Sequence, residues 1–202
     1  MIARSAKRTL LDEHLLQAAR QLTYEHGPDV SMSSIASTVG VSVGTIYTHF
    51  DSKHGLMVAS ALDGFSKFAD KYRPLVEGAD DPAAAVSLFF RLLCRLPITD
   101  PVLASVVYHY QRFMWTPENL RSEENVLIGD LRAGVLSGRF NGDNMIGKAA
   151  VIMGSALHVI SIQVNDPSTP AGISDAAAEA VLVMLGVDPL EAKRIAYSPI
   201  PS

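Results

Sequence analysis

The chain is short of cysteine, of charge and of strand-like alternation, and each shortage excludes a class of protein. Cys94 is its single cysteine, which rules out an intrachain disulfide and any metal site built from several thiolates. We interpret this thiol as a buried structural group rather than a redox sensor. Few segments alternate apolar and polar residues with period two, while aromatic and aliphatic residues recur at helical spacings. The sequence therefore predicts an all-α protein.

Long apolar runs are also scarce. The opening sequence MIARSAKRTLLDEHLL interrupts any apolar stretch with charge, so it does not match a secretory signal. The longest apolar stretch, 149–164, is too short to span a bilayer comfortably and contains His158 and Gln163. We therefore expect a cytoplasmic protein without a membrane anchor.

Positive charge is limited as well, since the net charge is −4. Residues 1–62 carry five basic and five acidic side chains, so this part is neutral while the rest is acidic. The basic arm of Arg4, Lys7 and Arg8 is the one local positive cluster. Net charge bears on association rather than on fold, so it only tempers a prediction of nucleic-acid binding.

The segment SMSSIASTVGVSVGTIYTHFDSK, residues 31–53, is what the chain does contain. Ser31 and Ser42 are each placed to cap a short helix, and Gly40 can take the left-handed conformation between them. Ile46 and Phe50 are the inward anchors of the second helix. Its other residues, small or polar at the N-terminal end, can face outward, which is what a reader of the DNA major groove needs.

Helical spacing continues through the rest of the chain, and Pro and Gly mark the ends of the segments. A first helix is predicted over 9–26, ended by Gly27-Pro28, and a fourth over 53–72, ended before Pro74. We expect a helix-turn-helix domain of three helices at 1–55 and a larger helical domain at 56–202. Further helices are predicted over 83–96, 101–115, 117–137, 144–164, 174–185 and 190–196.

Two short motifs suggest catalysis but fail the test of context. Residues 40–44, GVSVG, fit a nucleophile elbow, yet a helix-like segment precedes them where a hydrolase needs a strand. Residues 142–148, GDNMIGK, fit P-loop spacing, but Ala149 stands where a metal-binding hydroxyl is required. His49 and His54 lack a carboxylate or cysteine that would complete a metal site. We predict no enzyme activity, no metal and no cofactor.

Residues 9–62 resemble the DNA-binding domain of the TetR family of bacterial transcriptional regulators. The resemblance rests on His26-Gly27, on 31–36, on 40–42, on 44–50 and on Ser52-Lys53. It implies a homodimer whose two recognition helices enter successive major grooves of a pseudo-palindromic operator. The other 140 residues fit the family's ligand-binding and dimerisation domain only by length and helical pattern.

Matching positions imply the DNA contacts. Tyr47, His49 and Lys53 would reach phosphates, and Ser31 and Ser42 would add contacts from the helix N-termini. Base edges would be approached by Val43, Gly44 and Thr45, where Val43 stands in place of a common polar residue.

Two further sets of residues are predicted in the larger domain. An apolar effector pocket with a few polar groups is expected around the helix 101–115; its candidates are Phe89, Phe90, Val106, His109, Tyr110, Phe113, Met114 and Trp115. Plain core packing is the alternative for each. The last two long helices would form the dimer interface, through Met153, Ala156, Leu157, Ile160, Val181, Met184 and Leu185.

The sequence thus predicts a DNA-binding regulator, a repressor released from its operator by a small molecule. Activation is an alternative direction of control, and the effector and the operator sequence are left open. The competing hypothesis is a helical protein-interaction module with a vestigial helix-turn-helix, which the neutral charge of residues 1–62 would favour.

Overall fold

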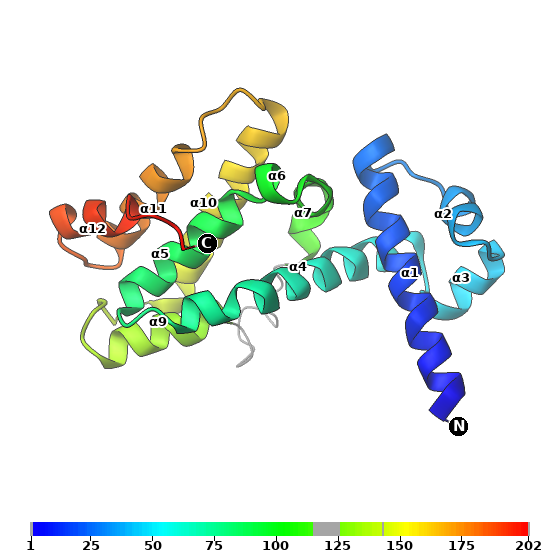
Figure 1. Ribbon diagram of the computed structural model, residues 1–202, viewed down its shortest axis with the longest axis horizontal. Coiled ribbons are helices and arrows are strands. Elements are labelled where there is room, and N and C mark those ends of the chain that lie inside the picture. The colour runs from blue at the N-terminus through cyan, green and yellow to red at the C-terminus, as the bar shows by residue number, and fades with distance from the viewer. Residues whose placement is uncertain (1, 115–125, 143, 202) are drawn as a thin grey trace. The chain divides into compact units, whose positions relative to one another are not determined.

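The computed structural model describes residues 2–114, 126–142 and 144–201, and all regular secondary structure in those ranges is α-helical. The chain divides into two compact units (Figure 1). The first unit is Met1–Lys67 together with Asp100–Met114, and the second is Phe68–Thr99 together with Trp115–Ser202. The prediction of an all-α protein with an N-terminal helix-turn-helix is confirmed.

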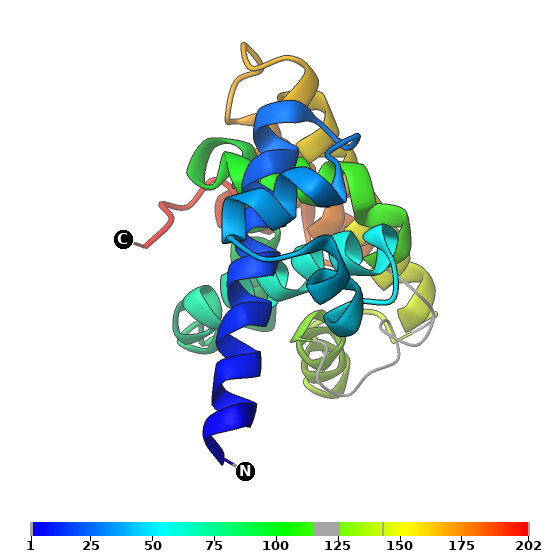
Figure 2. The ribbon, with the colours of Figure 1, turned by 90° about the vertical axis from the view of Figure 1, so that its right-hand side faces the viewer.

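The first unit is built on a long N-terminal helix. Its elements are α1 (Ile2–His26), α2 (Met32–Val39), α3 (Val43–His49), the first part of α4 (Lys53–Glu77) and α7 (Pro101–Met114). Figure 2 shows α2 and α3 on the same side of α1. Fully buried aliphatic side chains from four of these helices form its core: Leu15, Ile35, Ile46, Leu56 and Met57.

Helix α7 belongs to the first unit because it packs along α1. Gly64 on α4 permits this arrangement, since a Cβ atom there would lie 2.6 Å from Cδ1 of Leu103. Arg20 of α1 ties the same region together by donating to the Ser60 carbonyl at 2.7 Å and to Asp63 at 2.8 Å. The unit that carries the helix-turn-helix is therefore larger than residues 1–55.

The second unit surrounds α5 (Pro82–Cys94), which is buried along nearly its whole length. Around it pack α9 (Val126–Leu136), α10 (Met145–Asn165), α11 (Ile173–Met184) and α12 (Pro189–Ala196), while the short α6 (Leu96–Thr99) follows it directly. Because α5 packs against several helices, it is apolar around its circumference except at Ser87 and at the ion-paired Arg91.

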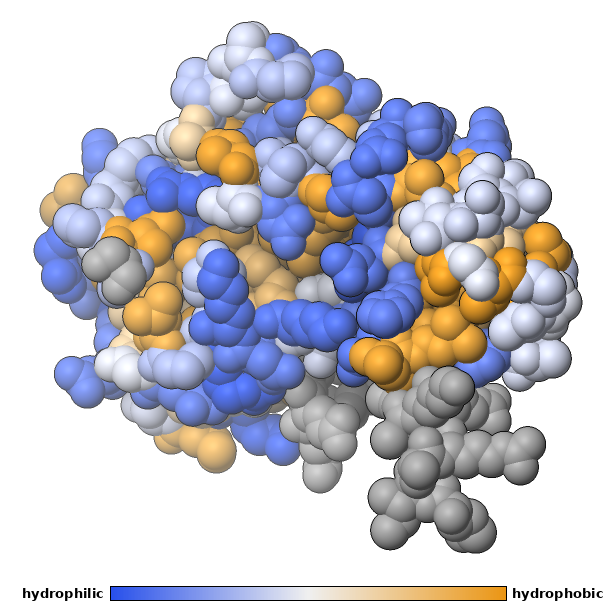
Figure 3. Space-filling model, turned by 45° about the vertical axis from the view of Figure 1, so that its right-hand side comes forward, coloured by the Kyte–Doolittle hydropathy of each residue, from blue (hydrophilic) through white to orange (hydrophobic). Residues whose placement is uncertain are grey.

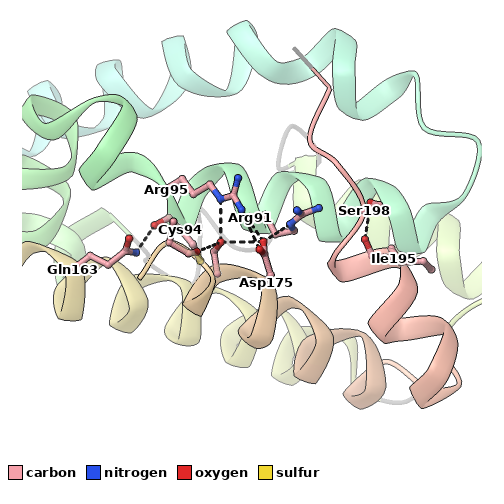
Figure 4. Close-up of polar contacts among 9 residues, drawn as sticks. Arg91, Cys94, Arg95, Gln163, Asp175, Ile195 and Ser198 are labelled. Atoms are coloured by element: carbon pink, nitrogen blue, oxygen red, sulfur yellow. Dashed lines mark hydrogen bonds and ion pairs between the residues drawn. The ribbon is translucent and has the colours of Figure 1, made fainter. Parts of the chain in front are cut away.

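Arginine–carboxylate pairs hold the second unit together at two places. Arg91 of α5 and Arg95, the C-cap of this helix, both contact Asp175 of α11, at 2.7 and 2.9 Å (Figure 4). Arg139 bridges Asp81, the N-cap of α5, and Glu191 of α12 at 2.9 Å each. Each site joins segments that lie far apart in the sequence.

Most predicted helices are found within a few residues of their expected ends, with three exceptions. The first helix was predicted from residue 9, but α1 already begins at Ile2. α4 continues through Pro74 to Glu77, whereas the sequence predicted an end before this proline. Pro74 has no N–H to donate to the Asp70 carbonyl one turn earlier, and α4 ends three residues later, so the helix continues for only one turn from the proline. Of the helix predicted over 117–137, residues 117–125 lie outside the described residues, and α9 covers the rest.

One helix, α10, is long and apolar enough to cross a membrane. In this structure it instead packs against α5, α9 and α11, with Ile152, Ala156 and Ile160 buried. Core helices of globular domains commonly pass the same test of length and composition, so α10 gives only weak evidence for a membrane span.

Candidate nucleic-acid interface

Two serine caps and one glycine determine the geometry of the helix-turn-helix. The Ser31 hydroxyl accepts from the Ser34 amide at 3.0 Å, and the Ser42 hydroxyl accepts from the Thr45 amide at 3.0 Å. Gly40 has a φ of 76°, and its amide donates to the Ala36 carbonyl at 2.9 Å. The structure therefore confirms both predicted caps and the left-handed turn.

The N-terminal turn of α3 presents little bulk to its surroundings. Gly44 is exposed, and a Cβ atom built there would have no closer neighbour than the Ser42 hydroxyl at 3.6 Å. Val43 and Thr45 are half-buried on either side. Another molecule could thus approach the backbone at Gly44, and the unpaired amides of the first turn point outward.

Tyr47 lies further along α3 with 49% of its surface exposed. Among the residues that the structure describes, no hydrogen bond is recorded for its hydroxyl. Ile46, its neighbour, is fully buried and anchors the helix to the core, as the sequence predicted. Tyr47 therefore offers a free hydroxyl on a fixed helix.

His49 differs from the expectation that it faces outward. Its side chain is only 12% exposed, and Nδ1 contacts Oδ1 of Asp12 on α1. Asp12 was not among the predicted site residues, because nothing in the local pattern of α1 indicates that it meets α3. The imidazole edge opposite Nδ1 is the part that could still reach a ligand.

Lys53, at the start of α4, also has a partner within the first unit. Its Nζ atom donates to the Pro28 carbonyl at 3.2 Å, which uses one of the three ammonium hydrogens. The lysine therefore lies beside the loop that precedes α2 and keeps spare donors for another acceptor.

The predicted effector residues fall in both units. Phe89 and Phe90 are buried in the second unit, where Phe89 lies 6.1 Å from Phe68 between ring centroids. Val106, His109 and Tyr110 belong to α7 in the first unit, and burial lowers the pKa of His109. The side chains of Phe113 and Met114, and the whole of Trp115, lie outside the described residues.

Tyr110 has contacts that the sequence did not indicate. Its hydroxyl donates to the Pro28 carbonyl at 3.4 Å, and its ring lies 6.4 Å from that of His54. Burial, and then the charge of Asp29, raise its pKa. Tyr110 therefore links α7 to the loop that leads into α2.

The predicted dimer residues are already covered by the chain's own packing. Met184 is half-buried, and the other six are buried within the second unit: Met153, Ala156, Leu157, Ile160, Val181 and Leu185. The sequence pattern selects the most apolar stripe of each helix, and that stripe packs against neighbouring helices of the same unit. On the opposite side of α10 and α11, Val151 is 55% exposed, and Gly154, Ala176, Ala180 and Val183 are exposed as well.

The catalytic motifs have ordinary structural roles. Ser42 of the apparent elbow is a helix cap whose hydroxyl also bonds the Thr45 hydroxyl at 2.8 Å. In the apparent P-loop, Asn144 caps α10 by accepting from the Gly147 amide at 3.2 Å. Across the residues that the structure describes, no group of three or more histidine, cysteine, aspartate or glutamate side chains could hold a metal ion.

Hydrophilic side chains cover much of the face shown in Figure 3, with apolar side chains gathered in smaller groups between them. Residues 1–62 carry as many acidic as basic side chains, so this part of the chain cannot attract DNA strongly by bulk charge. Recognition would then depend on the few groups at α3 and at the two helix N-termini.

Comparison with known proteins agrees with this geometry. Residues 15–59 match the family model described as "Bacterial regulatory proteins, tetR family", and residues 81–198 match "Tetracyclin repressor-like, C-terminal domain". A search of curated proteins gave no match.

Solved structures with the same fold include several regulators. RolR without ligand is 25% identical with a TM-score of 0.78, and 94% of this chain aligns with 98% of RolR. RolR with resorcinol has a TM-score of 0.71 at 25% identity, with 98% of each chain covered. The regulator FadR from Bacillus subtilis, in complex with stearoyl-CoA, is 21% identical with a TM-score of 0.70; 85% of this chain aligns with 98% of FadR. The two matched domains span most of the described residues, and this chain belongs to the TetR family of transcriptional regulators.

Proposed function

We propose that the chain is a homodimeric repressor that binds a pseudo-palindromic operator and leaves it when a small molecule binds. The observation that carries this proposal is the exposed, bulk-free N-terminal turn of α3, held in place by the Ser42 cap and by Ile46. A major-groove reader needs such a turn on a rigid support.

Specific roles follow from where each side chain lies. Val43, Gly44 and Thr45 would approach base edges, with Gly44 allowing close contact. Tyr47 would donate its free hydroxyl to a phosphate, and Lys53 its spare ammonium hydrogens. Ser31 and Ser42 stand at helix N-termini, where backbone amides attract anions. His49 would add a phosphate contact through the nitrogen that Asp12 leaves free.

Dimer formation would use the exposed side of α10 and α11. Val151 and Gly154 on α10, with Ala176, Ala180 and Val183 on α11, form an apolar and small-residue face on two helices that pack together. Small residues let helices approach closely, and two helices per subunit would give a four-helix interface. A monomer that does not associate at any concentration in sedimentation equilibrium would count against this interface.

Effector control would act through α7. This helix packs along α1 and, through Tyr110, touches the loop before α2. A molecule bound among the apolar residues around α7 could shift this helix and so change the position of α2 and α3. It must bind the two conformations with different affinity, since otherwise it shifts nothing. RolR with resorcinol and FadR with stearoyl-CoA suggest an effector with an apolar or aromatic part.

A regulator of this kind acts in the cytoplasm and needs no catalytic group. The competing function, a protein-interaction module, would leave the exposed turn of α3 without a role. Binding to DNA separates the two functions.

The test is a titration of fluorescent DNA fragments from around the protein's own gene, at several salt concentrations. We expect tight binding to one fragment and a linear fall of log K with log salt. Lys53→Ala should weaken binding to all sequences alike and lower the salt slope by about one. Lys71→Ala, an exposed lysine of α4 in the second unit, is the matched control and should change neither.

Equal and weak binding to every fragment would contradict the repressor proposal and favour the interaction module. A loss on Lys53→Ala that differs between sequences would contradict only the phosphate role of this lysine.

A further inference from the structure

The contact between His49 and Asp12 joins the end of the recognition helix to α1. Nδ1 of His49, the last residue of α3, meets Oδ1 of Asp12, which is half-buried with its side chain 35% exposed. The imidazole itself is largely enclosed. Because α3 ends here, the pair determines the direction in which the opposite ring nitrogen, Nε2, points.

The chemistry of the pair limits what Nε2 can do. An ionised carboxylate only accepts hydrogen bonds, so Nδ1 of His49 must carry the hydrogen that Asp12 accepts. In a neutral imidazole, Nε2 then has a lone pair and no hydrogen. A DNA phosphate oxygen is also an acceptor, so a neutral His49 in this arrangement cannot bind one. Only the imidazolium can donate to Asp12 and to a phosphate together.

We propose that His49 takes up a proton when the protein binds its operator, and that Asp12 is the positioning residue that makes this uptake necessary. The proposal rests on the proposed function, because it needs a phosphate beside Nε2. In the complex the imidazolium would lie between two anions, the Asp12 carboxylate and the phosphate, and both favour the charged form. Operator affinity would therefore rise as pH falls through the range in which histidines titrate.

Of the side chains that the structure describes on the helices next to His49, few are charged. Helix α2, which packs against α3, contains no titratable residue, and α3 itself adds only Tyr47. On α1, Glu13 and His14 follow Asp12 and are exposed, and Arg8 precedes it by one turn. After α3 come Asp51 and Lys53, the latter directed to the Pro28 carbonyl. Asp12 is the charged group that the structure places on the imidazole.

The test measures operator affinity by fluorescence anisotropy between pH 5.5 and 8.5 at constant ionic strength. For the natural chain we expect affinity to rise up to tenfold per His49, and so up to about a hundredfold for the dimer, for each unit of falling pH across the histidine range. Asp12→Asn should abolish most of this dependence, because an amide NH2 can donate to Nδ1 and leave a hydrogen on Nε2 of the neutral ring. Binding at pH 8 should then match or exceed that of the natural chain.

Two further variants complete the design. His49→Gln should also lose the pH dependence, whereas His14→Gln, an exposed histidine of α1, should keep it. Nitrogen NMR of the free protein at high pH gives a readout that needs no DNA: neutral His49 should carry its hydrogen on Nδ1, and in Asp12→Asn the hydrogen should move to Nε2.

Each failure has a distinct meaning. Salt-dependent operator binding without pH dependence, or with pH dependence that survives His49→Gln, would overturn the proton uptake while leaving the repressor proposal intact. A neutral His49 with its hydrogen on Nε2 in the natural chain would overturn it as well. Absence of operator binding at every pH and salt concentration would overturn the proposed function and, with it, this inference.

Discussion

The polar groups at α3 in the first unit differ from the buried ion pairs of the second unit in how many of their donors and acceptors the fold itself uses. In the second unit, Arg91 is only 5% exposed and shares the carboxylate of Asp175 with Arg95, so these cations join distant segments of the fold. Arg20 has the same role in the first unit, where it pairs with Asp63. The groups on and beside α3 differ: within the described residues no hydrogen bond is recorded for the Tyr47 hydroxyl, Lys53 uses one of its donors, and Asp12 contacts Nδ1 of His49 and leaves Nε2. Donors and acceptors left over at α3 are what a ligand could bind.

A buried ion pair costs much to desolvate, so it stabilises a fold only when its partners are complete. Asp175 meets this condition: it is 15% exposed, accepts from two guanidinium groups and has the Ser174 hydroxyl 3.2 Å away. Substituting these groups one at a time tests the difference between the two units.

The largest effect is expected from Asp175→Asn. The substitution leaves the buried guanidinium of Arg91 without a counter-charge, and loss of one partner of a buried pair typically costs about 3 kcal/mol of the free energy of unfolding. Urea unfolding followed by circular dichroism measures it. Asp70→Asn removes the exposed partner of Arg73 on α4 and should leave the free energy of unfolding nearly unchanged, because water screens this pair.

Equal losses in the free energy of unfolding for Asp175→Asn and Asp70→Asn would show that burial does not determine how much each ion pair contributes to stability. The distinction between the charged groups of the two units would then be wrong.

Gly44→Ala is expected to act on binding and not on folding. A methyl group at this exposed position meets no atom closer than 3.6 Å, and alanine favours a helix by up to about 1 kcal/mol over glycine. We expect a slightly more stable protein whose operator affinity falls about tenfold, since the methyl group would stand between backbone and base edge. Ser37→Ala, on the exposed side of α2, is the control.

Thermal unfolding and the anisotropy titration measure the two effects separately. Unchanged operator affinity in a folded Gly44→Ala protein would remove the N-terminal turn of α3 from the interface.

Asp130 is an acidic exception in the second unit, because its carboxyl is partly buried and its Oδ2 atom has no hydrogen-bond partner within the described residues. Burial, and then the charge of Glu77, raise its pKa to about 6. A raised pKa means that the folded state binds the proton more tightly than the unfolded state does. The fold therefore loses stability as pH rises from about 4 to about 6, and the loss is complete above that range.

Asp130→Asn should remove this cost and stabilise the protein by about 1 kcal/mol at pH 8, with solvent screening taken into account. Near pH 4 the gain should vanish. Urea unfolding at both pH values decides it, with the exposed Asp80→Asn as a control that should show no such difference. A gain of equal size at both pH values would assign the effect to packing and not to charge.

The features that the sequence predicted correctly depend on residues close to one another in the chain. The serine caps, the left-handed Gly40 and the buried Ile46 depend on residues within four positions of one another, so their spacing was sufficient. The contacts between segments that lie far apart in the sequence produce no such local pattern. Asp12 lies 37 residues from His49, and Asp175 lies 84 residues from Arg91.

The predicted dimer interface also shows that a sequence pattern does not identify the partner of a buried surface. Helical periodicity identified the apolar stripe of α10 correctly, but it does not say whether that stripe packs within the chain or against a second copy. Met153, Ile160 and Val181 are buried within the second unit, so the face proposed for a partner is the less apolar one. Helical periodicity indicates that one side of a helix is buried. Only the tertiary structure shows whether a helix of the same chain or a second copy covers that side.

The smallest effect is expected at Cys94. Oxidation of this thiol tests whether the second unit is chemically unreactive. The thiol is fully buried, and burial raises its pKa, although the nearby charge of Arg95 acts in the opposite direction. Thiolate is the form that oxidants attack, so a buried neutral thiol should not react. Mild peroxide should leave operator affinity unchanged, both in the natural chain and in Cys94→Ser. Labelling of Cys94 by a thiol reagent only after denaturation would show that burial protects the thiol. Loss of affinity on oxidation that Cys94→Ser prevents would instead make this helix a redox-sensitive element, and the inert character assigned to the second unit would have to be given up.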